Sequence, residues 1–69
     1  MKLKSNIGWL IDKLYYTRAD LMRIFNKFRN TISAWCASKS YPNTLGLFHL
    51  ADLLGVKVDD LYDVITVED

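Results

Sequence analysis

Two helical patterns follow one another between residues 17 and 37 with almost no chain between them, and this spacing restricts the fold more than any other feature. The first begins with the tetrapeptide TRAD at residues 17–20, where a Thr hydroxyl and an acid three residues later have the arrangement of a capping box. It ends at Asn26, because Asn tolerates the left-handed backbone of a helix end. The second pattern covers about residues 28–37, and its inward side chains are Ile32 and Trp35.

With so short a connection, the two helices must cross steeply about a tight turn. This is the geometry of a helix-turn-helix, in which the second helix projects into the major groove of DNA. Small helical proteins of other functions also pack helices across short turns. The spacing alone therefore leaves both interpretations open.

Two further elements are expected before this helix pair. Residues 1–5, MKLKS, alternate apolar and polar side chains as a short strand does. Residues 6–15 predict a helix that Ser5 or Asn6 can cap. The side chains expected to be buried in the first two helices are spaced three and four residues apart; they are Ile7, Leu10, Ile11 and Leu14, followed by Leu21, Ile24 and Phe25.

Three elements are expected after the helix pair. A loop at residues 38–43 contains a Pro, which lacks the N–H needed inside a helix, and the next helix runs from Asn43 or Thr44 to a left-handed stop at Gly55. A short fifth helix is expected at about residues 58–62, followed by a β-branched tail or strand at residues 63–69. Such a tail needs a neighbour, either the strand at residues 1–5 or a second copy of the chain; the candidate dimer contacts are Tyr62, Val64, Ile65 and Val67.

The charges are unevenly distributed along the chain. Residues 1–51 carry eight cations and two acids, whereas residues 52–69 carry one cation and six acids, so the net charge of +1 conceals a strong asymmetry. A polyanion would be attracted to the first part and repelled by the last. A mixture of solvated charges is the other explanation of such a pattern.

Size and composition limit the remaining possibilities. With 69 residues the chain can form one domain, which we expect to span residues 1–69 with a helical part at 6–62. Its apolar runs are too short to cross a membrane and residues 1–6 lack the apolar block of a secretory signal, so we expect a soluble cytoplasmic protein. One Cys and one His cannot form a disulfide or a four-ligand zinc site. We expect no cofactor, no small-molecule ligand and no enzymatic activity, since no catalytic set of residues is evident.

Together these segments resemble the Cro/CI-type helix-turn-helix family, the lambda-repressor-like or XRE-type DNA-binding domains of phage and bacterial regulators. The resemblance runs without gaps over residues 7–62 and is carried by TRADL, TISAW, Pro42 and LFHLADLLGVKVDDLY. Its most specific part is Ala51, nine residues after the Pro, followed by Leu-Gly-Val and by an acidic pair before Leu61. It implies an all-α fold of five compact helices, to which short members add terminal strands, and a homodimeric repressor of transcription on a pseudo-palindromic operator in double-stranded DNA.

The resemblance also implies which residues contact DNA. The helix at 28–37 would lie in the major groove, where an Arg suits guanine and an Asn suits adenine. The base-reading residues would be Arg29, Asn30, Ser33 and Ala34. Contacts to the DNA backbone would come from the start of the preceding helix, from the turn and from the loop at 38–43; these residues are Thr17, Arg18, Lys27, Lys39, Ser40, Tyr41 and Asn43.

The turn departs from the family pattern at Lys27 and Phe28, where an apolar residue and then a capping hydroxyl are usual. Either the cap is lost, at a cost of about 1 kcal/mol, or Phe28 supplies the apolar contact and a nearby amide supplies the acceptor. The departure favours an alternative function, a helix-turn-helix scaffold that binds mainly protein as an antitoxin or anti-repressor component. Its binding surface would be the apolar helix at 6–15 or the C-terminal tail.

Overall fold

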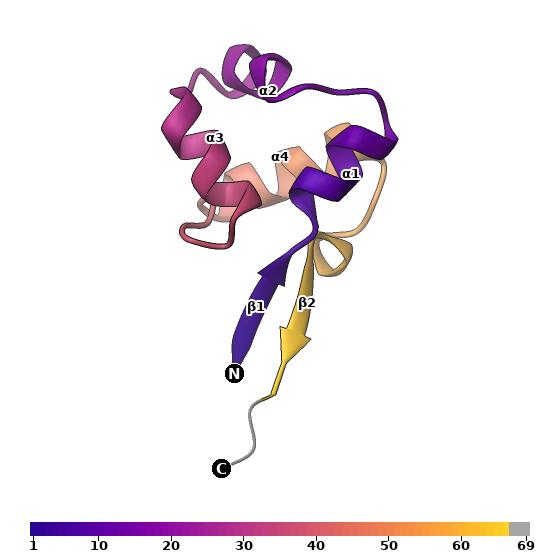
Figure 1. Cartoon of the computed structure of the whole chain (residues 1–69). Coiled ribbons are helices and arrows are strands. Elements are labelled where there is room, and N and C mark those ends of the chain that lie inside the picture. Colours follow the sequence, from indigo (N-terminus) through magenta and orange to yellow (C-terminus); the bar gives the residue numbers. More distant parts are fainter. Residues whose placement is uncertain (67–69) are drawn as a thin grey trace.

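A computed structural model describes residues 1–66; residues 67–69, and with them the expected dimer contact Val67, lie outside the described part. The chain forms β1 (Lys2–Ser5), α1 (Ile7–Lys13), α2 (Arg18–Phe25), α3 (Arg29–Cys36), α4 (Thr44–Leu54), a single 3-10 turn η1 (Val58–Leu61) and β2 (Tyr62–Ile65). Figure 1 shows the helices gathered into one body from which the two strands project side by side. Within residues 1–66 no helix is both long enough and apolar enough to cross a membrane.

The predicted caps of α2 and α4 are confirmed. The Asp20 N–H donates to Thr17 Oγ1 over 3.1 Å, and the Thr17 N–H donates to Asp20 Oδ2 over 2.9 Å. Asn26 ends α2 with a φ of 54°. Asn43 Oδ1 accepts a backbone N–H in the first turn of α4, and Gly55 ends that helix with a φ of 68°. Each cap depends only on groups a few residues away, which is why the sequence predicted them.

The first two helices bury less than predicted. The helix expected at residues 6–15 ends at Lys13, because Tyr15 has a left-handed φ of 64°. Leu14 therefore lies beyond the regular helix and is 39% exposed, and in α2 Ile24 is 36% exposed. The prediction that both are buried was wrong. Helices of only seven and eight residues that pack on a small core bury few side chains, here Ile7, Leu10 and Ile11 of α1 and Leu21 of α2.

The start of α1 is held by contacts from both ends of the chain. Ser5 Oγ accepts the Ile7 N–H over 3.2 Å, whereas the side chain of Asn6 makes no cap bond. The Asn6 amide instead donates to Asp63 Oδ1 over 3.2 Å, and the Asn6 N–H donates to the Leu61 carbonyl over 2.8 Å. Asn6 thus ties α1 to the C-terminal segment.

The predicted fifth helix is wrong, because within residues 1–66 the chain has four α-helices and η1 is a 3-10 turn. The Asp60 N–H donates to the Lys57 carbonyl over 2.9 Å, and Asp60 Oδ2 accepts the Lys57 N–H over 3.1 Å. Directly after this turn, Tyr62 is extended and pairs with Ser5 across the sheet. Because Tyr62 is extended and paired in the sheet, η1 ends at Leu61 after a single turn.

The terminal strands pair with each other, so the fold is mainly helical with a small antiparallel sheet rather than all-α. The register places Leu3 opposite Val64 and Ser5 opposite Tyr62. Because side chains alternate along a strand, these four share one face of the sheet. The other face carries the pairs Lys2–Ile65 and Lys4–Asp63. Of the two neighbours that the sequence left open for the tail, the structure contains the strand of the same chain.

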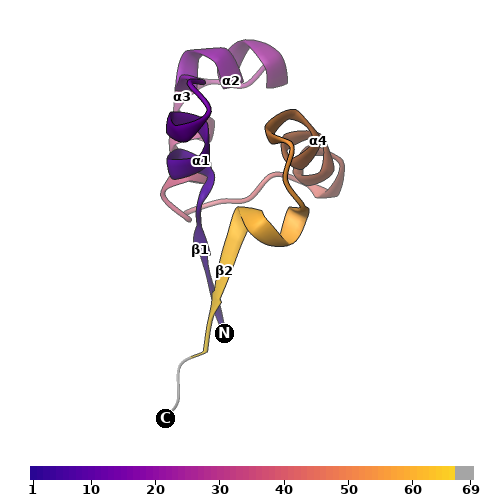
Figure 2. The ribbon, with the colours of Figure 1, turned by 90° about the vertical axis from the view of Figure 1, so that its right-hand side faces the viewer.

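The helices enclose one core. Figure 2, turned by a quarter from Figure 1, shows α1 and α3 on one side, α4 on the other, and α2 across the top. Every one of these helices and η1 contribute to the buried side chains, which are Ile7, Leu10, Ile11, Leu21, Ile32, Trp35, Leu50, Ala51, Leu54 and Leu61. This core fixes the orientation of α3, which carries the four expected base-reading residues, and of α2 before it.

Candidate nucleic-acid interface

The connection between α2 and α3 is a sharp turn at residues 26–28. Its first residue, Asn26, is left-handed, and its last, Phe28, is extended with φ −75° and ψ 158°. The ring of Phe25 meets the ring of Trp35 edge-on, with centroids 5.6 Å apart and planes at 88°. This contact fixes α2 against α3, and Figures 1 and 2 show α2 lying across the end of α3. The arrangement has the geometry of a helix-turn-helix.

The two faces of α3 differ in burial. Ile32 and Trp35 are 0% and 4% exposed and face the core. The opposite face forms a shallow depression of about 290 Å³, which brings together four of the predicted site residues, Asn30, Ser33, Ala34 and Lys39, with Ala37. Arg29 is exposed at the first position of the helix, directly before this depression. The outward face of α3 is therefore polar, cationic at both ends and open to a partner.

The start of α3 has no side-chain cap. The Thr31 and Ile32 N–H groups donate to the Phe28 carbonyl over 3.0 and 3.2 Å, whereas Phe28 has no side-chain acceptor for the first N–H groups. Phe28 is also 85% exposed, so it supplies no apolar contact to the turn. Of the two alternatives, the structure has the one in which the cap is lost. The uncapped N–H groups and the helix dipole favour an anion in front of α3.

Residues from the turn and from the loop at 38–43 meet in a second hollow. It has a volume of about 190 Å³, and Lys27, Tyr41 and Asn43 line it with Thr31 and Gly46. Asn43 Oδ1 is already bonded as the cap of α4, which leaves its NH₂ group free to donate. The ring of Tyr41 packs against Tyr62, with centroids 5.5 Å apart. Three of the predicted backbone contacts thus lie together beside α3.

The loop after α3 folds back over the end of that helix. Ser38 is left-handed with a φ of 64°, and the Lys39 and Ser40 N–H groups both point to the Ala34 carbonyl, over 2.9 and 3.3 Å. Ser38 Oγ accepts the Ser5 N–H over 2.7 Å, which ties the loop to β1. The sequence did not reveal this last contact, because it joins residues 33 positions apart.

Two predicted site residues at the start of α2 are engaged within the fold. The Thr17 hydroxyl and N–H form the capping box with Asp20. A Cβ on Gly8 would lie 3.5 Å from Cys36 Cβ and 3.8 Å from Arg18 Nη2, so the Arg18 guanidinium reaches the junction of α1 and α3. Burial raises the pKa of the Cys36 thiol, and the charge of Arg18 opposes that rise. The structure therefore does not bring Arg18 to the depression on α3.

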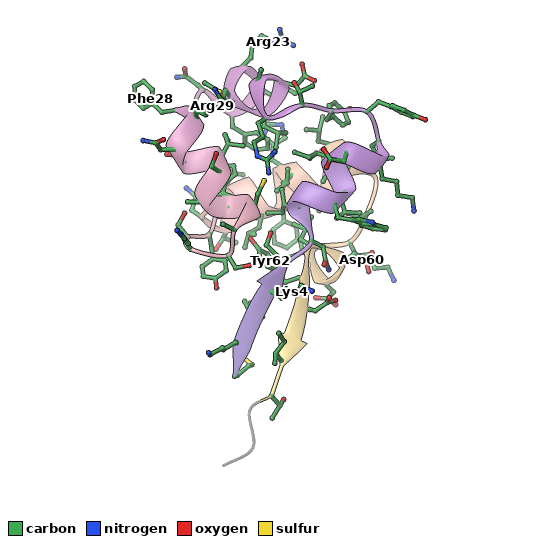
Figure 3. All side chains as sticks on the ribbon, viewed as in Figure 1. Lys4, Arg23, Phe28, Arg29, Asp60 and Tyr62 are labelled. Carbon is green, nitrogen blue, oxygen red and sulfur yellow. The ribbon has the colours of Figure 1, made fainter. Side chains whose placement is uncertain are left out.

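Cations gather at the end of the molecule formed by α2 and the start of α3. Figure 3 shows Arg23 and Arg29 there with Phe28, and Asp60 near the place where the strands leave the body. The acid of α2, Asp20, forms an ion pair with Arg23 at 3.0 Å. Its pKa is held below the ordinary value, first by the Thr17 N–H and hydroxyl and then by Arg23. The charge asymmetry of the sequence is thus only partly kept in space, because Asp59, Asp60 and Asp63 of η1 and β2 lie at the same end of the molecule as Lys2 and Lys4 of β1.

Comparison with known proteins relates the chain to a solved structure. No family model and no curated protein matches the sequence. Among solved structures, the chain is similar to the crystal structure of a protein from Bacteroides fragilis that is described as a putative DNA-binding protein. The two are 31% identical and superpose with a TM-score of 0.79, over 88% of this chain and 98% of the other.

Proposed function

The chain belongs to the family of this Bacteroides fragilis protein, and we propose that it is a sequence-specific DNA-binding regulator of the Cro/CI type that acts in the cytoplasm. One observation carries the proposal. The outward face of α3 gathers Asn30, Ser33, Ala34 and Lys39 around one depression, with Arg29 directly before it. These residue types match what the edges of DNA bases offer in the major groove.

In this proposal α3 lies in the major groove and reads bases through its first two turns. Arg29 donates two parallel hydrogen bonds to O6 and N7 of a guanine, and Asn30 pairs with N6 and N7 of an adenine. Ser33 bonds a base or a phosphate. Ala34, which is half-buried and lines the depression, contacts a thymine methyl.

Phosphates on the two sides of the groove hold α3 in register. On one side are Lys39 and Ser40, in the loop that folds over the end of α3. On the other are Lys27, Tyr41 and the NH₂ group of Asn43, which line one hollow. The uncapped start of α3 adds backbone N–H donors. Thr17 and Arg18 contribute less than the family pattern implies, because both are engaged within the fold.

We further propose that the protein is a homodimeric repressor on a pseudo-palindromic operator, since two-fold symmetry of a dimer matches two half-sites. The sheet supports a dimer contact. Leu3, Tyr62 and Val64 line an apolar hollow of about 330 Å³, and Val64 is 62% exposed. The buried hydroxyl of Tyr62 has no hydrogen-bond partner within residues 1–66. Loss of solvent raises the pKa of this hydroxyl to about 12, so it stays protonated.

The experiment that tests this function separates base reading from phosphate binding. A preferred duplex is selected from a random library, and its affinity is compared with that of a random duplex at several salt concentrations. Arg29→Ala should reduce the preference for the selected duplex by roughly 5- to 150-fold, the equivalent of about 1 to 3 kcal/mol. Lys39→Ala should weaken binding to both duplexes alike, and it should lower by about 1 the slope of log affinity against log salt concentration.

Lys57→Ala is the matched control, because Lys57 is an exposed cation next to η1, away from α3. It should change neither measurement. The function is refuted if the wild-type protein binds the selected and the random duplex equally at physiological salt. The division of roles is refuted if Arg29→Ala and Lys39→Ala have the same effects.

The second candidate function is a helix-turn-helix scaffold that binds mainly protein. Exposed apolar side chains favour it: Leu45 and Phe48, about one turn apart on α4, are 80% and 63% exposed, and Trp9 on α1 is 62% exposed. Exposed apolar side chains that neighbour each other, as Leu45 and Phe48 do, are typical of contacts between proteins. Under this function the wild-type chain would show no affinity for any duplex, and its affinity for the partner would change little with salt.

A further inference from the structure

Phe28 lies directly before α3, and the stability of the fold does not explain why an aromatic side chain stands there. It is the N-cap residue, with φ −75° and ψ 158°, yet its side chain forms no cap. Figure 3 shows its ring at the outer end of the turn, next to Arg29 and pointing away from the body. At 85% exposure the ring buries almost nothing in the protein. A Ser or Asn would satisfy the same backbone better.

Of the other exposed aromatic side chains within residues 1–66, Trp9 and Tyr41 have partners within the chain, whereas Tyr15 and Phe48 take part in no aromatic or cation pair. Lys13 Nζ lies 4.9 Å from the centre of the Trp9 ring, and Tyr41 packs against Tyr62. Within residues 1–66, Phe28 takes part in no such aromatic or cation pair. An unpartnered apolar ring at a helix start calls for a partner outside the chain.

The charges around Phe28 indicate what this partner is. Its neighbours in sequence are the cations Lys27 and Arg29, both exposed. The acid of α2, Asp20, is already neutralised by Arg23. An apolar protein surface would have to cover both cations, whereas DNA offers phosphates to the cations and an apolar group to the ring. That group is the C5-methyl of thymine, which Phe can contact in the major groove.

We propose that Phe28 reads a thymine methyl group in the major groove, beside the base contacted by Arg29. The inference rests on the proposed function, because it requires α3 to lie in the groove. The N-terminal residues of such a helix reach the base edges first, so an N-cap side chain that points outward meets a base pair adjacent to the one read by Arg29. In this proposal the absence of a helix cap at Phe28 lowers the stability of the fold, and the Phe28 ring adds base specificity.

The test removes only the methyl group from the DNA. Each thymine of the selected duplex is replaced in turn by deoxyuridine, and affinities are measured for the wild-type protein and for Phe28→Ser. Wild-type affinity should fall about fourfold at a thymine adjacent to the position that Arg29→Ala relaxes, as expected for losing contact with one methyl-sized group. In Phe28→Ser the duplexes with thymine and deoxyuridine at this position should bind equally.

Phe48→Ser is the matched control, since it removes another exposed Phe, 63% exposed on α4 and away from α3. It should keep the wild-type response to deoxyuridine. Folding is checked by thermal denaturation. Phe28→Ser should melt at or above the wild-type temperature, because Ser adds the missing acceptor to an N-cap backbone that is already extended.

The outcomes separate this inference from the function on which it rests. A wild-type protein with no preference for any duplex overturns both. If the wild-type protein prefers the selected duplex but responds to no methyl group, or if Phe28→Ser responds as the wild type does, the regulator remains and the role of Phe28 is overturned.

Discussion

The helix ends in this protein are made by individual residues with left-handed backbone. Tyr15, Asn26, Ser38 and Gly55 all have positive φ. The N–H of the residue that follows each one donates to a carbonyl in the last turn of the preceding helix, over 2.8 to 3.1 Å. Only Gly55 adopts this conformation without strain, and Asn26 tolerates it. Tyr15 is the costliest of the four, since it has a bulky side chain and is 94% exposed.

Tyr15→Gly should therefore stabilise the protein. Relief of the left-handed strain outweighs the greater flexibility of Gly in the unfolded chain, and we expect the free energy of unfolding to rise by roughly 0.5 to 1 kcal/mol. Urea denaturation measures the change. Ser38→Gly is the comparison, because it relieves the same strain but removes the Oγ that accepts the Ser5 N–H. Ser38→Gly should therefore gain less stability than Tyr15→Gly, or lose stability. A Tyr15→Gly protein that is no more stable than the wild type would contradict the prediction of strain at Tyr15.

At the scale of elements, α2 is the helix most completely defined by its own sequence. Thr17 and Asp20 exchange hydrogen bonds at its start, Arg23 pairs with Asp20 one turn on, and Asn26 ends it. In contrast, α3 relies on its neighbours. Its start is uncapped, and it is held by Ile32 in the core and by Trp35 against Phe25. The helix proposed to bind DNA is thus supported by the one before it.

The capping box of α2 should make stability depend on pH in the acid range. The folded pKa of Asp20 is below its ordinary value of 3.8, so ionised Asp20 stabilises the fold above this value. The contribution is lost as the pH falls through the lower folded pKa. Urea denaturation between pH 6 and pH 2 should show the stability advantage of the wild type over Asp20→Asn shrinking below about pH 4.

Arg23→Ala distinguishes the causes of this dependence. The backbone N–H of Thr17 lowers the Asp20 pKa more than Arg23 does. Arg23→Ala should therefore keep most of the pH dependence that Asp20→Asn removes. If Arg23→Ala and Asp20→Asn reduce the dependence of stability on pH equally, the ion pair and not the capping box is its cause.

At the scale of the whole molecule, the two ends of the chain form one sheet with two different faces. Leu3, Tyr62 and Val64 share the apolar face, with Tyr41 and Val58 around the same hollow. Ile65 lies on the other face, opposite Lys2. The sequence grouped Val64 and Ile65 as candidate dimer contacts, but the register separates them. The apolar face favours Val64 as the residue that contacts a second copy.

A pair of matched variants tests this surface. Val64→Glu should convert a wild-type dimer into a monomer, because a charge on the apolar face must be desolvated on association. Ile65→Glu introduces the same charge opposite Lys2, a favourable cross-strand pair, and should remain dimeric. Sedimentation or light scattering at micromolar concentration without DNA measures the mass. A wild-type monomer, or equal effects of the two changes, would refute the proposed dimer surface.

The sequence by itself determined the local features of this protein. Caps and helix stops at Thr17, Asn26, Asn43 and Gly55 depend on groups within a few residues, so their residue types were sufficient to predict them. The same holds for the inward pair Ile32 and Trp35, which follows from helical spacing.

Only the tertiary structure decided features that depend on distant partners. Pairing of β2 with β1 reduced the expected fifth helix to a 3-10 turn. It also brought Asp63 next to Asn6, so that the Asn6 amide donates to a residue 57 positions away instead of capping α1. The limited size of the core left Leu14 and Ile24 partly exposed. For the candidate site, the spacing predicted the outward face of α3, whereas the engagement of Arg18 beside Cys36 and the free ring of Phe28 emerged only once the helices were packed. Long-range contacts are what a local pattern cannot contain.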